Sequence, residues 1–356
     1  MEQLTEKERF LQHICSEQGE TFQYNKEAIL KDYRTQIENR SNLAIKLLTI
    51  VGGVAACLFF LIFLFITGIY DDPITLIILG TISIFIAVNI QKKHNTLIFS
   101  TISSAMYLIG YFMIAFSLYS EELNKSSISI VLMLIAIVVL CATQHFMLSF
   151  FSILLINKNL AFLLVSYSDD LIHLYIILQV IAFAYLLLYE AKFMVKNKKT
   201  SALYAPIRAG LLLSLLGGLY TVRILRLLTF TSDYFWLSSI AIIATILYVI
   251  HIINGYMEIN TTKSKVIMYG LSGLILAMCI TSPAILGALL IILLSFLVNY
   301  KTGFTVGIVS IIYFITQYYY DLSFTLLTKS ILLFTSGLIF LLLYLFTKNI
   351  SINEKK

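Results

Sequence analysis

The sequence predicts an all-α fold, a polytopic transmembrane helix bundle of about 12 spans with a short cytoplasmic N-terminal helical hairpin. Of its 356 residues, 59% are hydrophobic and only 12% are charged, and the mean hydropathy is +0.91, unlike the composition of a soluble domain. The apolar residues form runs close to the roughly 20 residues that a helix needs to cross a bilayer. Because these runs are continuous and do not alternate at every second residue, they predict helices and not the strands of a barrel.

The N-terminal segment, residues 1–42, is polar and mixes basic with acidic side chains. Apolar residues recur at helical spacing in two sets, one around Leu11 and one around Tyr33, with Gly19 between them. We expect a helical hairpin that serves as a collar at the membrane entry or as a docking surface for a partner helix. The mixed charge gives no support for nucleic-acid binding, and the polar character predicts no cleavable signal peptide.

Short polar links divide the rest of the chain into apolar runs. We expect a transmembrane bundle over residues 43–348 and a cytoplasmic tail over 349–356. The predicted spans are 47–70, 74–90, 97–119, 128–142, 146–165, 171–189, 203–228, 235–253, 266–280, 284–298, 305–320 and 323–346. Several are short, so tilted helices that rely on their neighbours are expected. The link between the fourth and fifth spans has no cation, which leaves open whether both cross fully.

Lysine and arginine concentrate in alternate links, and this bias indicates the side on which each link lies. They are frequent in the N-terminal segment, in the links that follow residues 90, 189, 253 and 298, and in the C-terminal tail. The opposite links carry acids, among them Asp72, Asp170 and Asp321. Because positively charged links stay in the cytoplasm, we expect both termini there.

Residues that could break a helix are few. Pro73 and Pro283 fall in links, and Pro206 is expected in the first turn of span 203–228, where its missing amide is harmless. Polar residues 157–159 interrupt the fifth span. They favour one tilted helix whose Lys158 snorkels outward, with a half-helix hairpin as the alternative.

The seventh predicted span, 203–228, has two distinct faces. Arg208 and Arg226 are five turns apart and share one face, and Arg223 lies about 60° away. At the inner end, Glu190 is the expected ion-pair partner of Arg208. Small residues at i, i+4 spacing, which let two helices approach closely, form the other face and recur elsewhere: Gly210, Ser214 and Gly218 here, Gly273 with Ala277, and Ala284 with Ala288.

The stretch 317–330 gathers aromatic and charged side chains between two apolar runs. Its tyrosines suit the level of the lipid headgroups, Asp321 ends the eleventh span, and Lys329 lies about 9 Å inside the next helix. A lysine at that depth must snorkel or find a partner. The predicted members of an outward-facing recess are Arg223, Arg226, Asp321, Lys329, Tyr319 and Tyr320. Guanidinium groups bind carboxylates and phosphates bidentately, so the recess is expected to hold an anionic group, with structural ion pairing as the alternative.

Patterns typical of catalysis, cofactor binding or metal binding are absent from the sequence. It has no HExxH, GxSxG, GxxxxGKS or GxGxxG motif, and its four cysteines are scattered without metal-ligand spacing. His145, His173 and His251 are each solitary. We therefore expect no metal and no cofactor, and the sequence favours a non-enzymatic protein while leaving enzymatic activity open.

Two regions resemble a known family. Residues 41–119 contain an apolar run with a GG pair and a GIY turn after an RSN link, and residues 283–346 contain a YYYD turn followed by TLLTKS and Gly337. This pattern resembles the uncharacterised bacterial membrane proteins of domain-of-unknown-function family 4401. The resemblance implies a bacterial inner-membrane protein with no established substrate, together with a partner membrane protein.

Two functions from different classes are consistent with these features. The first is a transporter-like or lipid-handling protein that binds an anionic solute or headgroup in the outer recess. The second is a non-enzymatic membrane scaffold that assembles with another membrane protein. The buried cations favour the first function, and the scarcity of helix breaks favours the second. Membrane lipids are expected partners in both.

The lysine bias yields a first prediction about topology. A reporter inserted at Gly19 and a reporter fused after Lys356 should both give a cytoplasmic signal, because the predicted number of spans is even. Paired cytoplasmic and periplasmic reporter fusions measure this directly. A periplasmic signal from only one position would show that the number of spans is odd.

Overall fold

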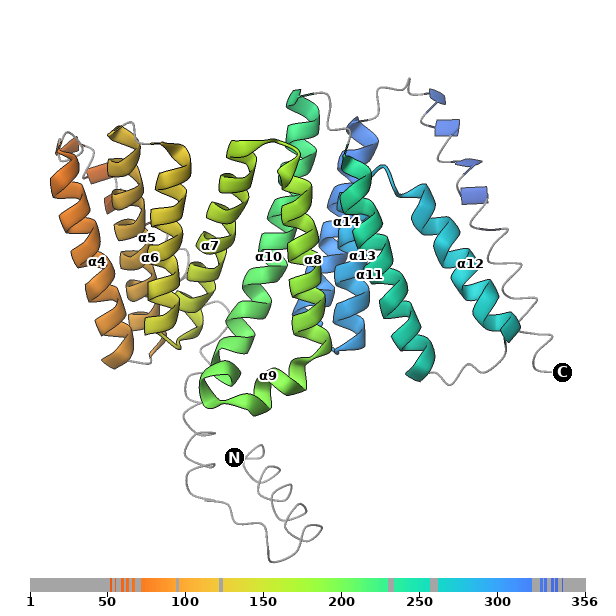
Figure 1. Ribbon diagram of the computed structural model, residues 1–356, viewed down its shortest axis with the longest axis horizontal. Coiled ribbons are helices and arrows are strands. Elements are labelled where there is room, and N and C mark those ends of the chain that lie inside the picture. The colour runs from red at the N-terminus through yellow and green to blue at the C-terminus, as the bar shows by residue number, and fades with distance from the viewer. Residues whose placement is uncertain are drawn as a thin grey trace, which may run out of the picture. The chain divides into compact units, whose positions relative to one another are not determined.

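A computed structural model describes residues 72–93, 96–121, 124–229, 234–256 and 262–321, with scattered positions in 52–67 and 327–341 (Figure 1). Within these residues the chain forms helices and no strand. The helices are α4 (Pro73–Lys93), α5 (Leu97–Ser120), α6 (Lys125–Ala142), α7 (Phe146–Tyr167), α8 (Leu171–Leu188), α9 (Glu190–Lys196), α10 (Lys198–Thr229), α11 (Phe235–Tyr256), α12 (Thr262–Met278), α13 (Pro283–Leu297) and α14 (Lys301–Asp321).

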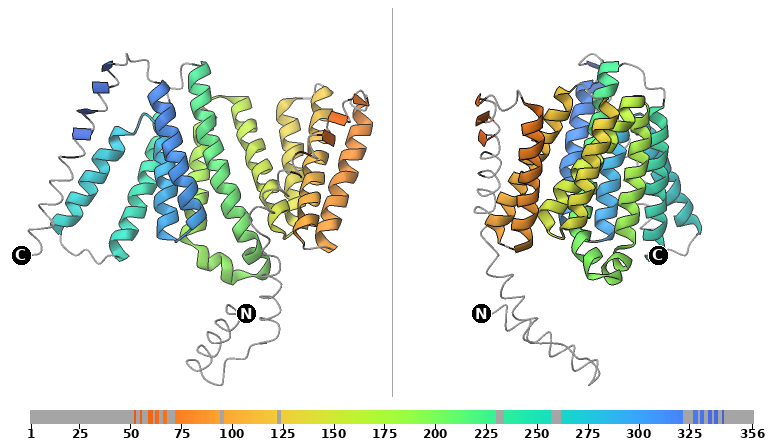
Figure 2. Two further views of the ribbon diagram at one scale, coloured as in Figure 1. Left: turned by 180° about the vertical axis from the view of Figure 1, so that it is seen from behind. Right: turned by 60° about the vertical axis from the view of Figure 1, so that its left-hand side comes forward.

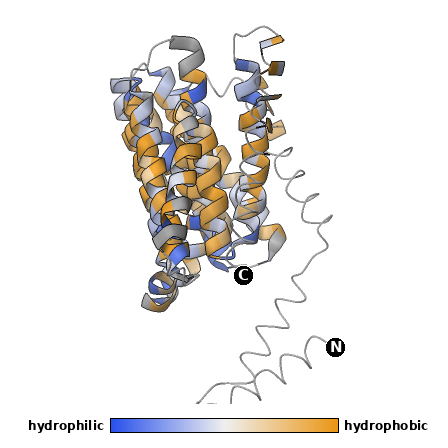
Figure 3. Cartoon of the chain, turned by 90° about the vertical axis from the view of Figure 1, so that its right-hand side faces the viewer, coloured by the Kyte–Doolittle hydropathy of each residue, from blue (hydrophilic) through white to orange (hydrophobic). Residues whose placement is uncertain are grey.

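The positions of these helices agree with the predicted spans. Every span predicted between residues 74 and 320 coincides with one helix. Among the described residues, seven helices are long and apolar enough to cross a bilayer, and Met268–Ala277 and Pro283–Leu297 are shorter apolar helices. Figure 3 shows hydrophobic residues along the middle of the helices and hydrophilic ones toward their ends. The chain is therefore a multi-pass helical membrane protein.

Several predicted elements lie outside the described residues. They are the N-terminal hairpin, most of the first and last predicted spans, Lys329 and the C-terminal tail.

The expectation for Pro206 was wrong. The helix that contains it, α10, begins at Lys198, so Pro206 lies inside the helix and not in its first turn. The apolar run marks only the part of the helix suited to hydrocarbon, whereas the polar residues before it are also helical. The short helix α9, which lies across the end of α8 and α10 in Figure 1, was not predicted either.

The fifth predicted span is one continuous helix, α7, as expected. Lys158 is exposed, whereas Asn157 and Asn159 are buried and each donates to the carbonyl four residues earlier. The amide of Gln179 on α8 also donates to Asn157 Oδ1. Polar side chains inside this span are thus hydrogen-bonded, which removes the need for a helix break.

The chain divides into two compact units, Met1–Ser152 and Ile153–Lys356, with the division inside α7. In the first unit, the N-terminus of α4 is capped by Asp72, whose carboxylate accepts from the Ile74 amide and the Thr75 hydroxyl. The hydrogen bond from Thr75 lowers the pKa of Asp72 below its ordinary value. Because Pro73 needs no amide partner, the helix can begin directly after this cap.

Helices α4 and α5 of the first unit pack with their backbones in contact. A Cβ atom added to Gly80 would lie 2.7 Å from the carbonyl oxygen of Gly110, and one added to Gly110 would lie 2.5 Å from that of Gly80. Three serine hydroxyls donate across the interface to backbone carbonyls: Ser83 to Met106, Ser103 to Ala87 and Ser117 to Pro73. This interface combines small residues with interhelical hydrogen bonds, both typical of packing in lipid.

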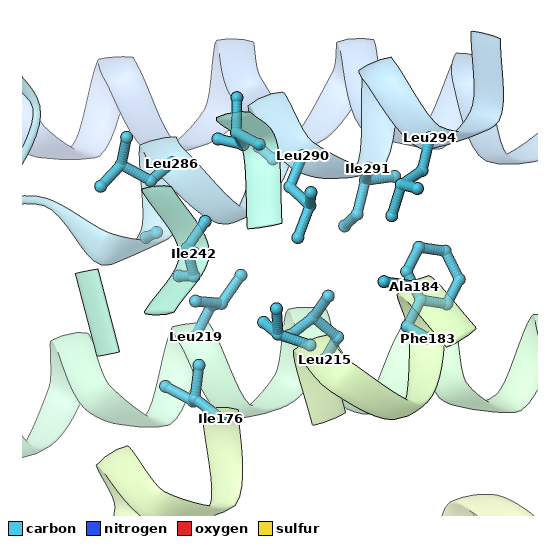
Figure 4. Packing of buried hydrophobic residues seen from close by; sticks show 14 of the residues in the cluster. Ile176, Phe183, Ala184, Leu215, Leu219, Ile242, Leu286, Leu290, Ile291 and Leu294 are labelled. Carbon is cyan, nitrogen blue, oxygen red and sulfur yellow. The ribbon is translucent and has the colours of Figure 1, made fainter. Parts of the chain in front are cut away.

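Helix α13 is at the centre of the second unit and contacts α8, α10, α11 and α14. Although short, it is buried along much of its length. The core side chains that converge on it, shown in Figure 4, are Ile176, Phe183 and Ala184 of α8, Leu215 and Leu219 of α10, Ile242 of α11, and Leu286, Leu290, Ile291 and Leu294 of α13 itself. Seen from behind, α14 lies beside α10 (Figure 2).

The small-residue face of α10 packs against α8. A Cβ atom added to Gly218 would lie 2.7 Å from the Tyr175 ring, and the Tyr175 hydroxyl donates to the carbonyl of Ser214 over 3.4 Å. Ala284 and Ala288 are also buried. Gly273, in contrast, has no atom within 4 Å of an added Cβ, so the close packing expected there is absent from the described residues.

A second prediction concerns this interface. Gly218→Leu should destabilise the protein by about 1–3 kcal/mol, because the added side chain collides with the Tyr175 ring. The matched change Leu213→Phe, on an exposed position of the same helix, should have little effect. Thermal unfolding in detergent compares the two variants, and equal midpoints would contradict close packing at Gly218.

Candidate functional site

The two ends of the second unit differ in charge. Successive helices alternate in direction, so the end of α8, all of α9 and the beginnings of α10, α12 and α14 lie at one end, which carries exposed Lys192, Lys199 and Lys301 (Figure 1). The opposite end carries Asp169, Asp170 and Asp321. This separation matches the alternation of charge in the links. A candidate site lies at each end, and the predicted recess belongs to the acidic end.

Arg223 of α10 and Asp321 of α14 form a bidentate ion pair. Nε of the arginine donates to Oδ2 over 2.7 Å, and Nη2 donates to Oδ1 over 2.9 Å. The side chains are 20% and 27% exposed, so the pair is partly shielded from solvent. Parallel N–H···O bonds of this kind are stronger and more directional than a single contact. The pair therefore joins the ends of two helices that are far apart in sequence.

The ion pair borders a recess of about 230 Å³. Its lining residues are Leu219, Val222, Arg223, Thr281, Ser282, Pro283, Ala284, Phe314, Tyr318 and Asp321. The walls are mainly apolar, and the polar groups among them are the ion pair and the hydroxyls of Thr281, Ser282 and Tyr318. The hydroxyls of Thr281 and Tyr318 lie 3.4 Å apart. A ligand here would meet one charged edge, a few hydroxyls and an apolar wall, which is the usual character of a small-molecule site.

The beginning of α13 also faces the recess. Pro283 is its first residue, and the preceding Ser282 makes no side-chain hydrogen bond to cap the helix. The first amides of a helix have no partner within it and carry partial positive charge. Ala284, in this first turn, lines the recess. The helix end and Arg223 thus both favour negative charge, which Asp321 supplies from within the chain.

The predicted members of the recess fall in different places. Arg223 and Asp321 are together, as described. The tyrosine that lines the recess is Tyr318. Tyr319 and Tyr320 do not line it, and their rings contact each other edge to face with centroids 5.8 Å apart. The Arg226 side chain and Lys329 lie outside the described residues.

Several lining residues were missed from the sequence, although one signal was available. Phe314 and Tyr318 precede Asp321 by seven and three residues, so the three share one face of a helix. Extending the helix back from Asp321 would have identified them. Thr281 and Ser282 lie in the link before α13, and no local pattern indicated that this link approaches Arg223.

The end of α10 on the lysine side also carries an ion pair. Arg208 Nη1 lies 3.7 Å from Glu190 Oε1, the partner expected from the sequence. The guanidinium group also lies 3.9 Å from the ring centroid of Tyr300 and 5.1 Å from that of Tyr204. Cation–π contacts of this kind stabilise a partly desolvated guanidinium. The aromatic partners had not been anticipated.

Metal-binding chemistry has no site in the part of the chain that the structure describes. No group of three histidine, cysteine, aspartate or glutamate side chains gathers there closely enough to hold an ion. Histidines instead bond to hydroxyls: His173 to Ser238 and His251 to Tyr269.

Comparisons with known proteins give one match. A family model described as "Domain of unknown function (DUF4401)" matches residues 42–349. No curated protein and no solved structure matches the chain.

A third prediction tests the energetic coupling of the Arg223–Asp321 pair. Asp321→Ala should destabilise the protein, because it leaves a partly desolvated guanidinium without its anion. Adding Arg223→Ala should restore part of the loss, with a coupling energy of about 0.5–3 kcal/mol. Thermal unfolding of the two single variants and the double variant gives this energy. Purely additive losses would mean that the pair contributes no coupling.

Proposed function

This chain belongs to the family of domain of unknown function DUF4401, and because that description names no activity, we propose a function from the recess itself. The protein binds the anionic group of a small amphiphilic solute or lipid in the recess between α10, α13 and α14. The single observation that carries this proposal is an arginine facing an apolar cavity beside the open end of a helix.

The chemistry of the walls supports an anion with a short apolar part. Arg223 presents a fork suited to carboxylate or phosphate, and the first turn of α13 adds partial positive charge. Leu219, Val222 and Phe314 offer apolar contact. At about 230 Å³ the recess is smaller than the roughly 300–1,000 Å³ of sites for drug-sized ligands. The recess is therefore of a size to hold a carboxylate, a phosphate or a lipid headgroup.

Asp321 would act as a resident counterion in this proposal. It occupies one edge of the guanidinium in the ligand-free chain and keeps Arg223 neutralised within the membrane. An incoming anion would replace one carboxylate by another negatively charged group, so the arginine would keep a partner throughout. Binding would be a competition between Asp321 and the ligand, and the strength of the internal pair would set the affinity.

We also propose that the lysine end of the second unit faces the cytoplasm of a bacterial inner membrane and that the recess opens toward the outside. The support is the concentration of lysine at one end and of aspartate at the other.

The competing function is that of a scaffold for another membrane protein. It is favoured by one observation, that the arginine already has a bidentate partner within the chain. A purely structural pair would lose stability when either member is changed and would show no opposite effects on ligand binding.

A fourth prediction separates the two functions. Binding of inorganic phosphate, hexanoate and phosphatidylglycerol is measured by native mass spectrometry and thermal shift of the protein in mild detergent. Asp321→Asn should raise the affinity for the preferred anion by about tenfold or more, because the internal competitor has lost its charge. Arg223→Gln should abolish binding. Asp169→Asn, an exposed acid at the same end, is the matched control and should change nothing.

Two results of this experiment would contradict anion binding in the recess. Loss of binding in both Asp321→Asn and Arg223→Gln, or no binding of any of the three probes, would overturn the proposal. Thr281→Val provides a variant that keeps the ion pair intact and should weaken binding without lowering the unfolding midpoint. A stoichiometric protein partner without a bound anion would support the scaffold.

A further inference from the structure

A second and larger concavity lies at the lysine end of the second unit. It is a groove of about 960 Å³ between the end of α8, the beginning of α9, and the inner ends of α11 and α13. The lining residues are Leu187, Leu188, Tyr189, Glu190, Ala191, Met194, Tyr248, Ile252, Ile253, Phe296, Leu297 and Val298. None of them belongs to the outer recess, so this site is independent of the function proposed above.

The groove is apolar and runs from the surface to the core. Phe296, Tyr248 and Met194 are 67%, 51% and 45% exposed, whereas Leu187 at its base is only 1% exposed. From Tyr248 to Ile253 it follows α11 for about 7.5 Å, which is the depth of the first several methylene groups of an acyl chain. An apolar channel that begins at the interface and continues into the hydrocarbon suits a chain and not a compact solute.

The mouth of the groove carries positive charge. Nζ of Lys192 lies 4.6 Å from the ring centroid of Tyr189, which lines the groove, so the ammonium lies at its rim. Lys199 is exposed at the beginning of α10, and Lys196 and Lys198 lie between them in the sequence. This lysine-rich segment includes α9, which lies across the end of the second unit (Figure 1). Lysine clusters beside transmembrane helices attract anionic lipid headgroups.

The acid at the rim does not cancel this charge. Glu190 is within 3.7 Å of Arg208, whose guanidinium is held in turn against the ring of Tyr300. The carboxylate is therefore already paired inside the chain. Lys192, in contrast, is stacked on an aromatic ring, and an ammonium in that position can still donate to a phosphate.

We propose that this groove binds an anionic phospholipid of the leaflet on the lysine side. One acyl chain occupies the apolar groove between α8, α11 and α13, and the phosphate lies at the rim beside Lys192. Tyr189 lies at the headgroup level, which is the usual position of tyrosine at a bilayer interface, and Tyr248 lines the deeper part of the groove. Glu190 is neutralised by Arg208, whereas Lys192 has no acidic partner in the part of the chain that the structure describes, so the rim selects a net negative headgroup over a zwitterionic one.

The experiment is a fifth prediction, made in mild detergent with the full chain carrying Arg223→Gln, so that no lipid is retained in the outer recess. Phosphatidylglycerol or phosphatidylcholine is titrated in, and retained lipid is counted by native mass spectrometry while the unfolding midpoint is followed. Phosphatidylglycerol should bind and raise the midpoint, and phosphatidylcholine should bind more weakly. Lys192→Gln should weaken phosphatidylglycerol binding about fivefold, the factor that corresponds to one lysine near a bilayer surface. Ile252→Trp should fill the groove and prevent binding of both lipids.

Two matched variants control for charge and for bulk. Lys301→Gln removes an exposed lysine at the same end outside the groove, and Ile240→Trp adds the same bulk to an exposed position near the other end of α11. Both should retain binding. Equal losses in Lys192→Gln and Lys301→Gln would show diffuse attraction to the whole end and overturn the site. Equal binding of the two lipids, or undiminished binding in Ile252→Trp, would overturn it as well.

Discussion

Helices in hydrocarbon gain little free energy from burying one apolar side chain against another, because lipid tails are equally apolar. Close backbone approach and polar contacts must supply the difference, and the architecture depends on this constraint. Gly80 and Gly110 bring two backbones together, and Gly218 accepts the ring of Tyr175. Arg223 and Asp321 join α10 to α14 at the acidic end of the second unit. A side chain added at these glycines would come closer than 3.0 Å to backbone or ring atoms, and an uncharged residue at Arg223 or Asp321 would break the ion pair.

The fold class and the positions of most helices could be predicted because an apolar run of about 20 residues is what a helix needs to cross the hydrocarbon layer. Polar segments carry no such signal, so α9 and the true beginning of α10 were missed. Small-residue spacing was a partial guide. It identified Gly218, but it also selected Gly273, where no atom of the described residues lies within 4 Å of an added Cβ. Spacing identifies a face of a helix, and only the tertiary arrangement determines whether another helix covers it.

The candidate site was predictable to the extent that physical cost restricts pairing. A guanidinium in the membrane needs an anion, and few acids were available on the same side, which made Asp321 the best candidate for Arg223 or Arg226; the structure pairs it with Arg223. The same reasoning paired Arg208 with Glu190. The remainder of the recess came from a link whose path depends on how α12 and α13 pack. No periodic pattern encodes that path, so Thr281 had no signal in the sequence.

The two arginine pairs give α10 a further property. Arg208 and Arg223 lie about 22 Å apart on one helix, and each is tied to an acid on a different element. Both ends of α10 are thus held by ion pairs to other helices. A ligand that binds one tilt of α10 more tightly than another would change the free energy of the ion pair at the far end of the helix. By thermodynamic linkage, a change in that ion pair would alter the affinity for the ligand by the same free energy. If lipid binding in the groove and anion binding in the recess each favour one tilt of α10, each would change the affinity of the other by the same factor.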